Sequence, residues 1–228
     1  MRREAIIELS HRMLPGRENF RLETRTFDVT ELLPEVVHRP DIWYVLSDIT
    51  MSSHVGTHVE FPYHHWQPGA DAASYPIGDL VGEGIVLDFS HKQPGECITK
   101  DELAAHAHRL REGDIVFIRT DLDRLYRTER WAEQPHLMPE AMRWLIDAFR
   151  PKVVGTDAAG FEVPGTDYQP NHLLMFQNGI AMVESATNLA AVGDHRVEVF
   201  ILPLAIEGID ACPVRIIAIR REAGDAGR

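Results

Sequence analysis

The sequence predicts a mixed α/β fold in which strands outnumber helices. Eight short segments rich in Val, Ile, Phe and Tyr, each bounded by Gly, Pro or polar residues, have the lengths of buried or half-buried strands. Two further segments carry clear helix signals, and the 228 residues contain no repeat, linker or low-complexity tract. We therefore expect one domain over residues 1–228, because single domains of this length are common.

The predicted strands are spread along the whole chain. In order they are Ala5 to Leu9, Ile42 to Ser47, Gly84 to Phe89, Asp114 to Arg119, Lys152 to Gly155, Ile180 to Val183, Val197 to Ile201 and Val214 to Ile219. Loops between them hold most of the Gly and Pro residues. This distribution favours one sheet-based domain over two separate ones.

The helix signals are local and chemically specific. Thr99 followed three positions later by Glu102 forms a capping box, which predicts a helix over Lys100 to Arg111. Pro139 opens a second helix with apolar residues at helical spacing, and Pro151 ends it. A third, shorter helix is predicted around Asn171 to Phe176.

Composition and charge restrict the partners. The apolar fraction of 44% and charged fraction of 25% are those of an ordinary globular chain, and 35 acidic against 23 basic residues give a net charge of −12. Such a surface repels phosphate backbones and anionic lipid headgroups, so we expect no nucleic-acid and no membrane partner. The two distant cysteines form no pair motif, and no apolar run is long enough for a signal peptide or a membrane span, so a cytoplasmic location is predicted.

The chemistry-bearing feature is a cluster of histidines. Four of the 12 histidines, at positions 54, 58, 64 and 65, fall within twelve residues that also contain Glu60. Imidazole and carboxylate groups are the ligands shared by Zn(II), Mn(II) and Fe(II). A lone histidine is more often a packed side chain than a ligand, but four with an acid predict a metal site. Three ligands leave coordination positions open, as a catalytic metal requires.

The backbone of this cluster is predicted to be extended rather than helical. His54 and His58 would share one helical face, but Gly56 is a poor helix residue and Pro62 follows closely. On a strand, His58 and Glu60 point the same way. Gly56 lets the chain fold His54 back beside them.

A family resemblance follows from these residues. The segment His54-Val-Gly-Thr-His58-Val-Glu60-Phe-Pro-Tyr-His64 resembles the signature H-x-G-T-H-x-D-x-P-x-H of the cyclase-like metal hydrolases, the group that contains bacterial kynurenine formamidase and isatin hydrolase. Further matches occur in the family's order along nearly the whole chain. They are Glu8 to His11, Gly113 to Thr120, Gly155 to Asp157, the stretch from His172 through Glu184 to Leu189, and Leu202 to Arg215.

The resemblance implies a fold, a site and an activity. It implies a swivelling β/β/α domain in which His54, His58 and Glu60 hold a first divalent ion, Zn or Mn. Glu60 would also face a second ion, completed by His172 and Glu184. The implied enzyme is a metal-dependent hydrolase of an amide, lactam or formamide C–N bond in a small-molecule substrate, assembled as a homodimer or homotetramer. Metal-bound hydroxide would attack the carbonyl, with His64 as the acid and base.

Two departures from the family pattern leave alternatives open. Glu60 stands where the family has Asp, and its longer side chain leaves one or two ions per chain possible. The loop at 14–20 lacks the tryptophan of the kynurenine formamidases, which argues against formylkynurenine as the substrate. A metal-dependent lyase or cyclase acting on a carbonyl substrate, and a non-catalytic metal-binding protein, are the rival hypotheses.

Overall fold

A nine-stranded mixed sheet organises the computed structural model, which describes residues 6–37, 39, 41–166 and 168–220. From edge to edge the strands are β1 (Ile6–Glu8), β13 (Arg215–Arg220), β11 (Val197–Leu202), β5 (Val81–Asp88), β7 (Ile115–Arg119), β9 (Val153–Thr156), β10 (Ala181–Glu184), β4 (His58–Glu60) and β12 (Ala211–Pro213). The central strands β5, β7, β9 and β10 run parallel, and the flanking pairs are antiparallel. The strand-rich α/β class is confirmed, and each predicted strand overlaps an observed one. The first residue of the first predicted strand, Ala5, lies outside the described residues.

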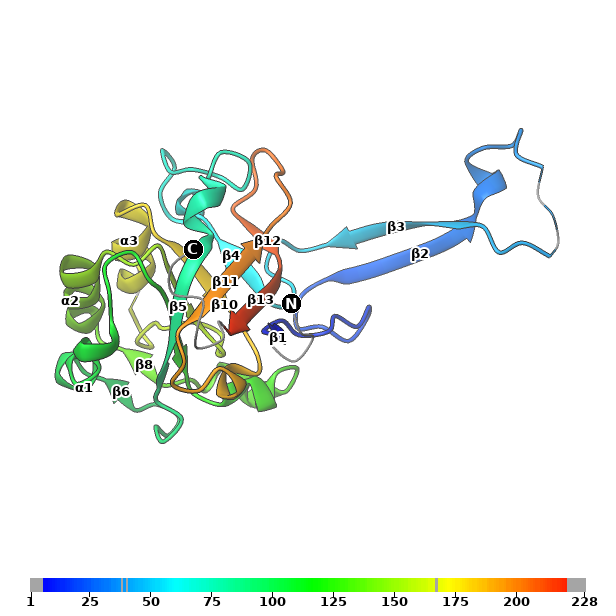
Figure 1. Ribbon diagram of the computed structural model, residues 1–228. Coiled ribbons are helices and arrows are strands. Elements are labelled where there is room, and N and C mark those ends of the chain that lie inside the picture. Colours follow the sequence, from blue (N-terminus) through cyan, green and yellow to red (C-terminus); the bar gives the residue numbers. More distant parts are fainter. Residues whose placement is uncertain (1–5, 38, 40, 167, 221–228) are drawn as a thin grey trace.

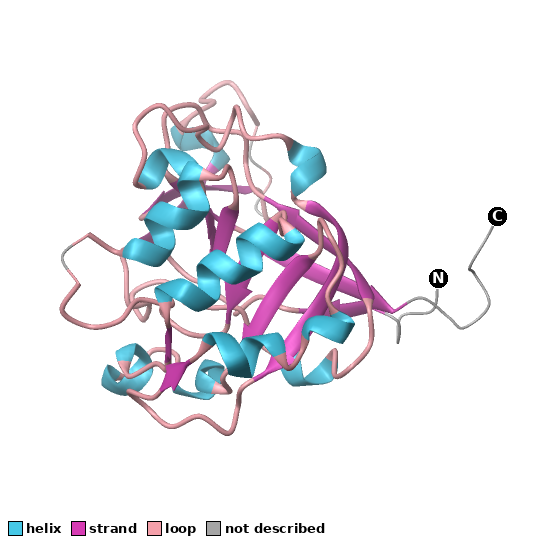
Figure 2. Ribbon diagram, turned by 90° about the vertical axis from the view of Figure 1, so that its left-hand side faces the viewer, coloured by secondary structure: helices cyan, strands magenta, loops and turns pink. Residues whose placement is uncertain are grey.

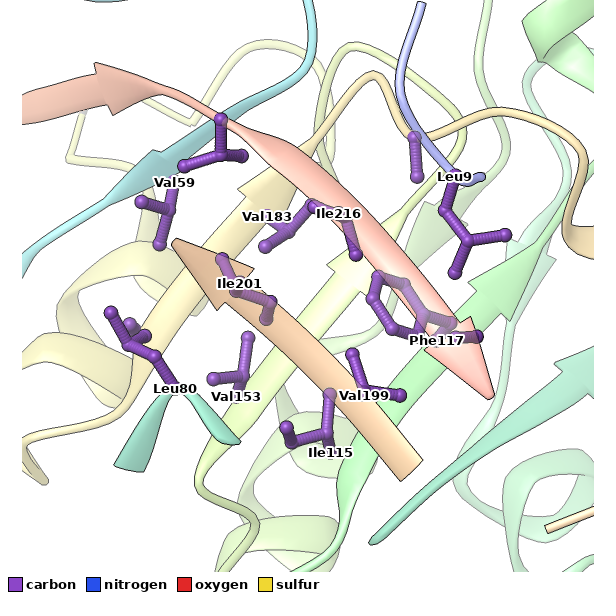
Figure 3. Close-up of a cluster of buried hydrophobic side chains, with 14 of the residues drawn as sticks. Leu9, Val59, Leu80, Ile115, Phe117, Val153, Val183, Val199, Ile201 and Ile216 are labelled. Atoms are coloured by element: carbon purple, nitrogen blue, oxygen red, sulfur yellow. The ribbon is translucent and has the colours of Figure 1, made fainter. Parts of the chain in front are cut away.

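Alternating side chains give the sheet two buried faces. In β7, Ile115 and Phe117 point into one core and Val116 and Ile118 into the other, as the two-residue period of a strand requires. Figure 3 shows Ile115 and Phe117 in the first of these cores, which β11 and β13 cover. A strand buried on both faces reads as a continuous apolar run, which is why this segment was recognisable in the sequence.

The sheet curls so that its two ends share this first core. Leu9, next to β1, and Val59, in β4, belong to the same buried cluster although their strands lie near opposite ends of the strand order. Two backbone hydrogen bonds hold the N-terminal strand in place, from the Leu9 amide to the Ile216 carbonyl and from the Thr187 amide to the Leu9 carbonyl. The curl brings the N-terminal segment close to the strands that carry the histidine cluster.

Three helices cover the other face of the sheet (Figure 2). They are α1 (Lys100–Ala104), α2 (Pro139–Phe149) and α3 (Pro170–Gln177). The capping box at Thr99 is present, but the predicted helix to Arg111 is wrong, because α1 ends at Ala104. Beyond it the backbone continues as the separate 3-10 helix η5 (Ala107–Arg109), and the Arg111 amide donates to the nearby Asp114 side chain instead of to the carbonyl four residues earlier.

A two-stranded ribbon projects away from this body (Figure 1). It consists of β2 (Leu22–Asp28) and β3 (Val45–Met51), paired antiparallel from Leu22 opposite Met51 to Asp28 opposite Val45. Strand β2 was not predicted, because its sequence LETRTFD has little apolar content. Exposed apolar side chains lie on the ribbon and next to it: Ile49 in β3 is 62% exposed, and Trp43, just before β3, is 86% exposed.

The remaining elements are short. A small parallel pair joins β6 (Cys97–Ile98) to β8 (His136–Leu137). Short 3-10 helices occur at η2 (Val29–Glu31), η3 (Pro62–His64), η4 (Ile77–Asp79), η5 (Ala107–Arg109), η6 (Leu122–Leu125), η7 (Glu129–Ala132) and η8 (Leu189–Ala191). Within the described ranges, no helix has the length and apolar character needed to cross a membrane.

Candidate metal centre

The histidine cluster lies where β4 meets β10. Antiparallel pairing places His58 directly opposite Glu184, and Glu60 follows two positions along β4, so both carboxylates approach the same side of the sheet. His54 reaches them from the preceding turn, where Gly56 adopts a φ of +73° that other residues rarely adopt. The predicted extended backbone, with His54 folded back beside His58, is confirmed: His54 Nδ1 lies 3.2 Å from His58 Nε2.

Helix α3 supplies the third imidazole from a distant part of the chain. His172 lies in its first turn, and His172 Nε2 is 3.3 Å from Glu60 Oε2 and 3.7 Å from Glu184 Oε1. On the opposite side, Glu60 Oε1 lies 3.0 Å from His54 Nδ1 and 3.5 Å from His58 Nε2. Glu60 therefore has one oxygen toward each of two donor groups, His54 with His58 and His172 with Glu184. Each group, with Glu60, has its ligand atoms within 4.8 Å of one another.

Each of the three rings is oriented by a partner outside the cluster. His58 Nδ1 lies 3.0 Å from the Gly56 carbonyl, His54 Nε2 lies 2.8 Å from Asp210, and His172 Nδ1 lies 2.7 Å from Glu162. These acceptors favour a proton on the outer nitrogen, which leaves the inner nitrogen of each ring directed at Glu60. Such outer partners are typical of metal-ligating histidines, because they set the tautomer and the ring direction.

The buried charges of this cluster fit a cation. Burial opposes a charged ring at His58, but hydrogen bonds to Glu184 and Glu60 outweigh it and raise its pKa to about 10. At His172, burial is likewise outweighed, by Glu162, Glu184 and Glu60, and the pKa rises to about 12. These shifts report a strongly negative environment in a buried place. A divalent ion can satisfy that environment in place of the protons, since histidine ligates metals in its neutral form.

One orphaned atom supports the same interpretation. Glu60 is 2% exposed, and among the described residues its Oε2 has no hydrogen-bond partner. A buried carboxylate oxygen without a partner is costly, so native structures usually satisfy it with protein, water or an ion. The donor set of imidazole and carboxylate is the one that Zn(II) and Mn(II) accept. The residues present therefore fit a divalent metal.

A small cavity opens directly onto the cluster. It has a volume of about 190 Å³ and is lined by Glu60, His64, Gln134, Ala159, Gly160, Glu162, Gln169, His172 and Glu184. Gly160 is required here, because a Cβ atom at this position would lie 2.8 Å from Glu184 Oε1. A larger cavity of about 690 Å³ lies between the base of the ribbon and the body, and its lining contains none of the predicted ligands.

His64 lies beside the cluster rather than within it. It ends the 3-10 helix η3 that follows Pro62, and its Nε2 is 3.9 Å from Glu60 Oε1. Its Nδ1 lies 2.9 Å from Asp210 Oδ2. Asp210 and Glu162 are the two residues of this neighbourhood that the sequence analysis missed. No local pattern marks them, because each lies in a loop, and the rings that they face are 156 residues away for Asp210 and 10 residues away for Glu162.

Three other candidates take no place in the two ligand groups. His65 stacks on His172, with 5.0 Å between ring centroids, so it packs against that ring and is not a ligand in these groups. Asp157 accepts hydrogen bonds from Thr120 and from the Asp121 amide. Arg119 pairs with Asp88 and Asp121. Asp157 thus supports the turn behind the cavity and does not line it.

An α/β fold that gathers three imidazoles and two carboxylates around one buried point has the donor set of a divalent-metal protein. The model of the family described as Putative cyclase matches residues 7–163. The chain therefore belongs to that family, as the resemblance in its sequence implied.

Known relatives agree with this assignment. A kynurenine formamidase of Erythrobacter litoralis (strain HTCC2594) is 30% identical over 222 residues, covering 93% of this chain and 89% of its own. A solved structure described as a potential metal-dependent hydrolase with cyclase activity has 27% identity and a TM-score of 0.75, with 95% of this chain and 98% of that one aligned. An isatin hydrolase bound to the product analogue thioisatinate, 18% identical with a TM-score of 0.81 over 95% and 92% of the two chains, shares the fold.

Proposed function

We propose that this protein is a metal-dependent hydrolase that cleaves the C–N bond of a small amide, lactam or formamide. The observation that carries the proposal is the inward direction of three imidazoles toward Glu60, whose buried Oε2 makes no hydrogen bond within the described part of the chain. The kynurenine formamidase and metal-dependent hydrolase relatives support the reaction class.

We assign the ligands as two groups that share one residue. His54, His58 and Glu60 would hold the first ion, and Glu60, His172 and Glu184 would hold a second where two are bound. Zn and Mn are the candidate metals. When bound, such an ion polarises a carbonyl oxygen and lowers the pKa of water to about 7.

His64 is the proposed proton-transfer residue. In the reaction a water oxygen bonds to the carbonyl carbon, the C–N bond breaks, and the leaving nitrogen gains a proton. His64 lines the cavity and can take the proton from water and return it to that nitrogen, a role worth typically ~10²- to 10⁴-fold in rate. The half-exposed Phe20 ring, 6.2 Å from the His54 ring, offers an apolar surface for the rest of the substrate.

The ribbon of β2 and β3 supports assembly as a homodimer or homotetramer. A two-stranded ribbon by itself is at best marginally stable in water, yet this one projects from the body and exposes Ile49, and the connection between its strands exposes Leu32 and Trp43. Pairing of the ribbon with a second copy would cover these side chains. A cytoplasmic location and the absence of nucleic-acid and membrane partners stay predictions, as does one domain over residues 1–228.

Two variants and a substrate panel test the proposal. His58→Ala should lose both metal and activity, whereas His64→Ala should keep its metal while turnover falls by ~10²- to 10⁴-fold. Elemental analysis measures the metal, and aryl formamides, lactams and esters measure hydrolysis. If the protein dehydrates a hydroxy acid and hydrolyses no amide, it is a lyase and not a hydrolase. If no carbonyl substrate gives an activity that a chelator abolishes, the protein only binds metal and is not an enzyme.

A further inference from the structure

We propose that Asp210 is a positioning residue that fixes the orientation and tautomer of two histidines at once, His54 and His64. The inference rests on the proposed function, because it explains how the proton-transfer residue is held against the metal cluster. It assigns a role to a carboxylate that no motif in the sequence pointed to.

A single oxygen of Asp210 meets both rings. Asp210 Oδ2 lies 2.8 Å from His54 Nε2 and 2.9 Å from His64 Nδ1, and the centroids of the two rings are 4.7 Å apart. The other oxygen, Oδ1, accepts a hydrogen bond of 3.0 Å from the Ser53 hydroxyl. The His54 contact is a hydrogen bond, and the His64 contact is a close ion-pair contact. An ionised carboxylate only accepts hydrogen bonds, so it favours a proton on the nitrogen that each ring turns toward it.

The consequence for the two rings is specific. With a proton on His54 Nε2, the opposite nitrogen Nδ1 is free to ligate, and it is this nitrogen that lies 3.0 Å from Glu60 Oε1. With a proton on His64 Nδ1, the opposite nitrogen Nε2 is a free acceptor, and it faces the cluster at 3.9 Å from the same Glu60 oxygen. Asp210 thereby prepares one ring as a ligand and the other as a base.

The backbone holds Asp210 rigidly enough for this role. It directly precedes β12, in which Ala211 is paired with Glu60, and the Asp210 carbonyl accepts from the Phe61 amide at 2.9 Å. The carboxylate is therefore anchored to the same strand that carries the ligands. A hydrogen-bonded carboxylate behind a catalytic histidine sets its tautomer, and its replacement by the amide isostere in a serine protease costs about 10⁴-fold in turnover with the geometry intact.

Asp210→Asn is the decisive variant, because it keeps the size of the side chain and removes the second acceptor oxygen. We expect zinc-loaded Asp210→Asn to lose ~10²- to 10⁴-fold in kcat with KM changed less than threefold. Zinc affinity should fall by about 10- to 100-fold, with full occupancy restored at saturating zinc. In ¹⁵N-resolved spectra of the zinc-loaded protein, the His64 ring, identified by its absence in His64→Ala, should change from the Nδ1-protonated tautomer to a mixture.

Asp71→Asn is the matched control. Asp71 Oδ2 accepts from the Gly208 amide, so it anchors the same loop without touching either ring. This variant should keep wild-type kcat, zinc affinity and His64 tautomer. If it reproduces the losses of Asp210→Asn, loop anchoring explains the effect and the proposal is overturned.

Two further outcomes would also overturn it. Wild-type kcat and tautomer in Asp210→Asn would show that neither ring depends on the carboxylate. Loss of an ion that saturating zinc does not restore would make Asp210 a ligand, in the group that it forms with His54 and His64. If the wild-type protein cleaves no amide, the proposed function fails by itself, and the His64 tautomer still decides the role of Asp210.

Discussion

Glu162→Gln tests whether the carboxylate behind His172 strengthens metal binding. Glu162 Oε1 accepts from the His172 backbone amide at 2.8 Å and lies 2.7 Å from His172 Nδ1, so one oxygen holds both the start of α3 and the ring. A glutamine keeps an oxygen in this place and can accept the same two hydrogen bonds. The negative charge is removed, and with it the support that makes the inner nitrogen a better ligand.

The size of the effect follows from the kind of hydrogen bond that is changed. A hydrogen bond to a charged group contributes about 1.5–3 kcal/mol and a neutral one about 0.5–1.5 kcal/mol, so the exchange removes roughly 1–1.5 kcal/mol. Since 1.4 kcal/mol corresponds to tenfold in affinity, we expect about tenfold weaker metal binding at the group that contains His172. This agrees with the lower end of the 10- to 100-fold range measured for such outer partners.

The assay is a competition titration of metal-free protein with zinc and a chromophoric chelator, with circular dichroism to verify the fold. Glu140→Gln, in the exposed first turn of α2, is the control for removing one negative charge elsewhere. It should bind zinc as the wild type does. A dissociation constant for Glu162→Gln within twofold of the wild-type value would refute the reasoning that this carboxylate tunes the ligand.

Three other predictions concern stability, pH and assembly. Burial lowers the pKa of His11 to about 4 from 6.5, so the unfolded chain binds more protons than the folded protein between these pH values. The free energy of unfolding therefore falls as the pH drops from about 6.5 to about 4. His11→Phe keeps the stack on Tyr126, and it should reduce this fall, measured by urea unfolding, by ~1–2 kcal/mol. Gly155→Ala should destabilise the protein by ~1–3 kcal/mol in thermal unfolding, because its Cβ would lie 2.7 Å from the Phe117 ring, and an unchanged Tm would contradict this. Trp43→Ser removes a large exposed apolar side chain, so the molar mass measured by light scattering should shift toward that of the monomer. An unchanged mass would show that this side chain does not contribute to the interface.

Local periodicity explains why so much of the fold was predictable. The alternation of Ile115 to Ile118 between two cores and the capping box at Thr99 are encoded within a few residues of each other. The end of α1 was mispredicted because the chain beyond Ala104 forms a separate 3-10 helix, and the Asp114 side chain accepts from the Arg111 amide, which an α-helix would direct at Ala107. The ribbon was half missed because β2 is stabilised by pairing rather than by an apolar run of its own.

The sequence alone identified a group of residues with the spacing of metal ligands. His54, His58 and Glu60 lie within seven residues, so a glycine turn followed by a strand is enough to bring them together. It also placed His172 and Glu184 in the site, but only through their order in a family pattern.

Only the tertiary structure decided how those groups face one another. The curl of the sheet and the pairing of β4 with β10 and β12 bring Asp210 and Glu162 against rings 156 and 10 residues away. These carboxylates lie in loops, so no helical or strand period connects them with the rings that they contact. Their direction depends on the packed fold, and so does the proposed division of the histidines into ligands and base.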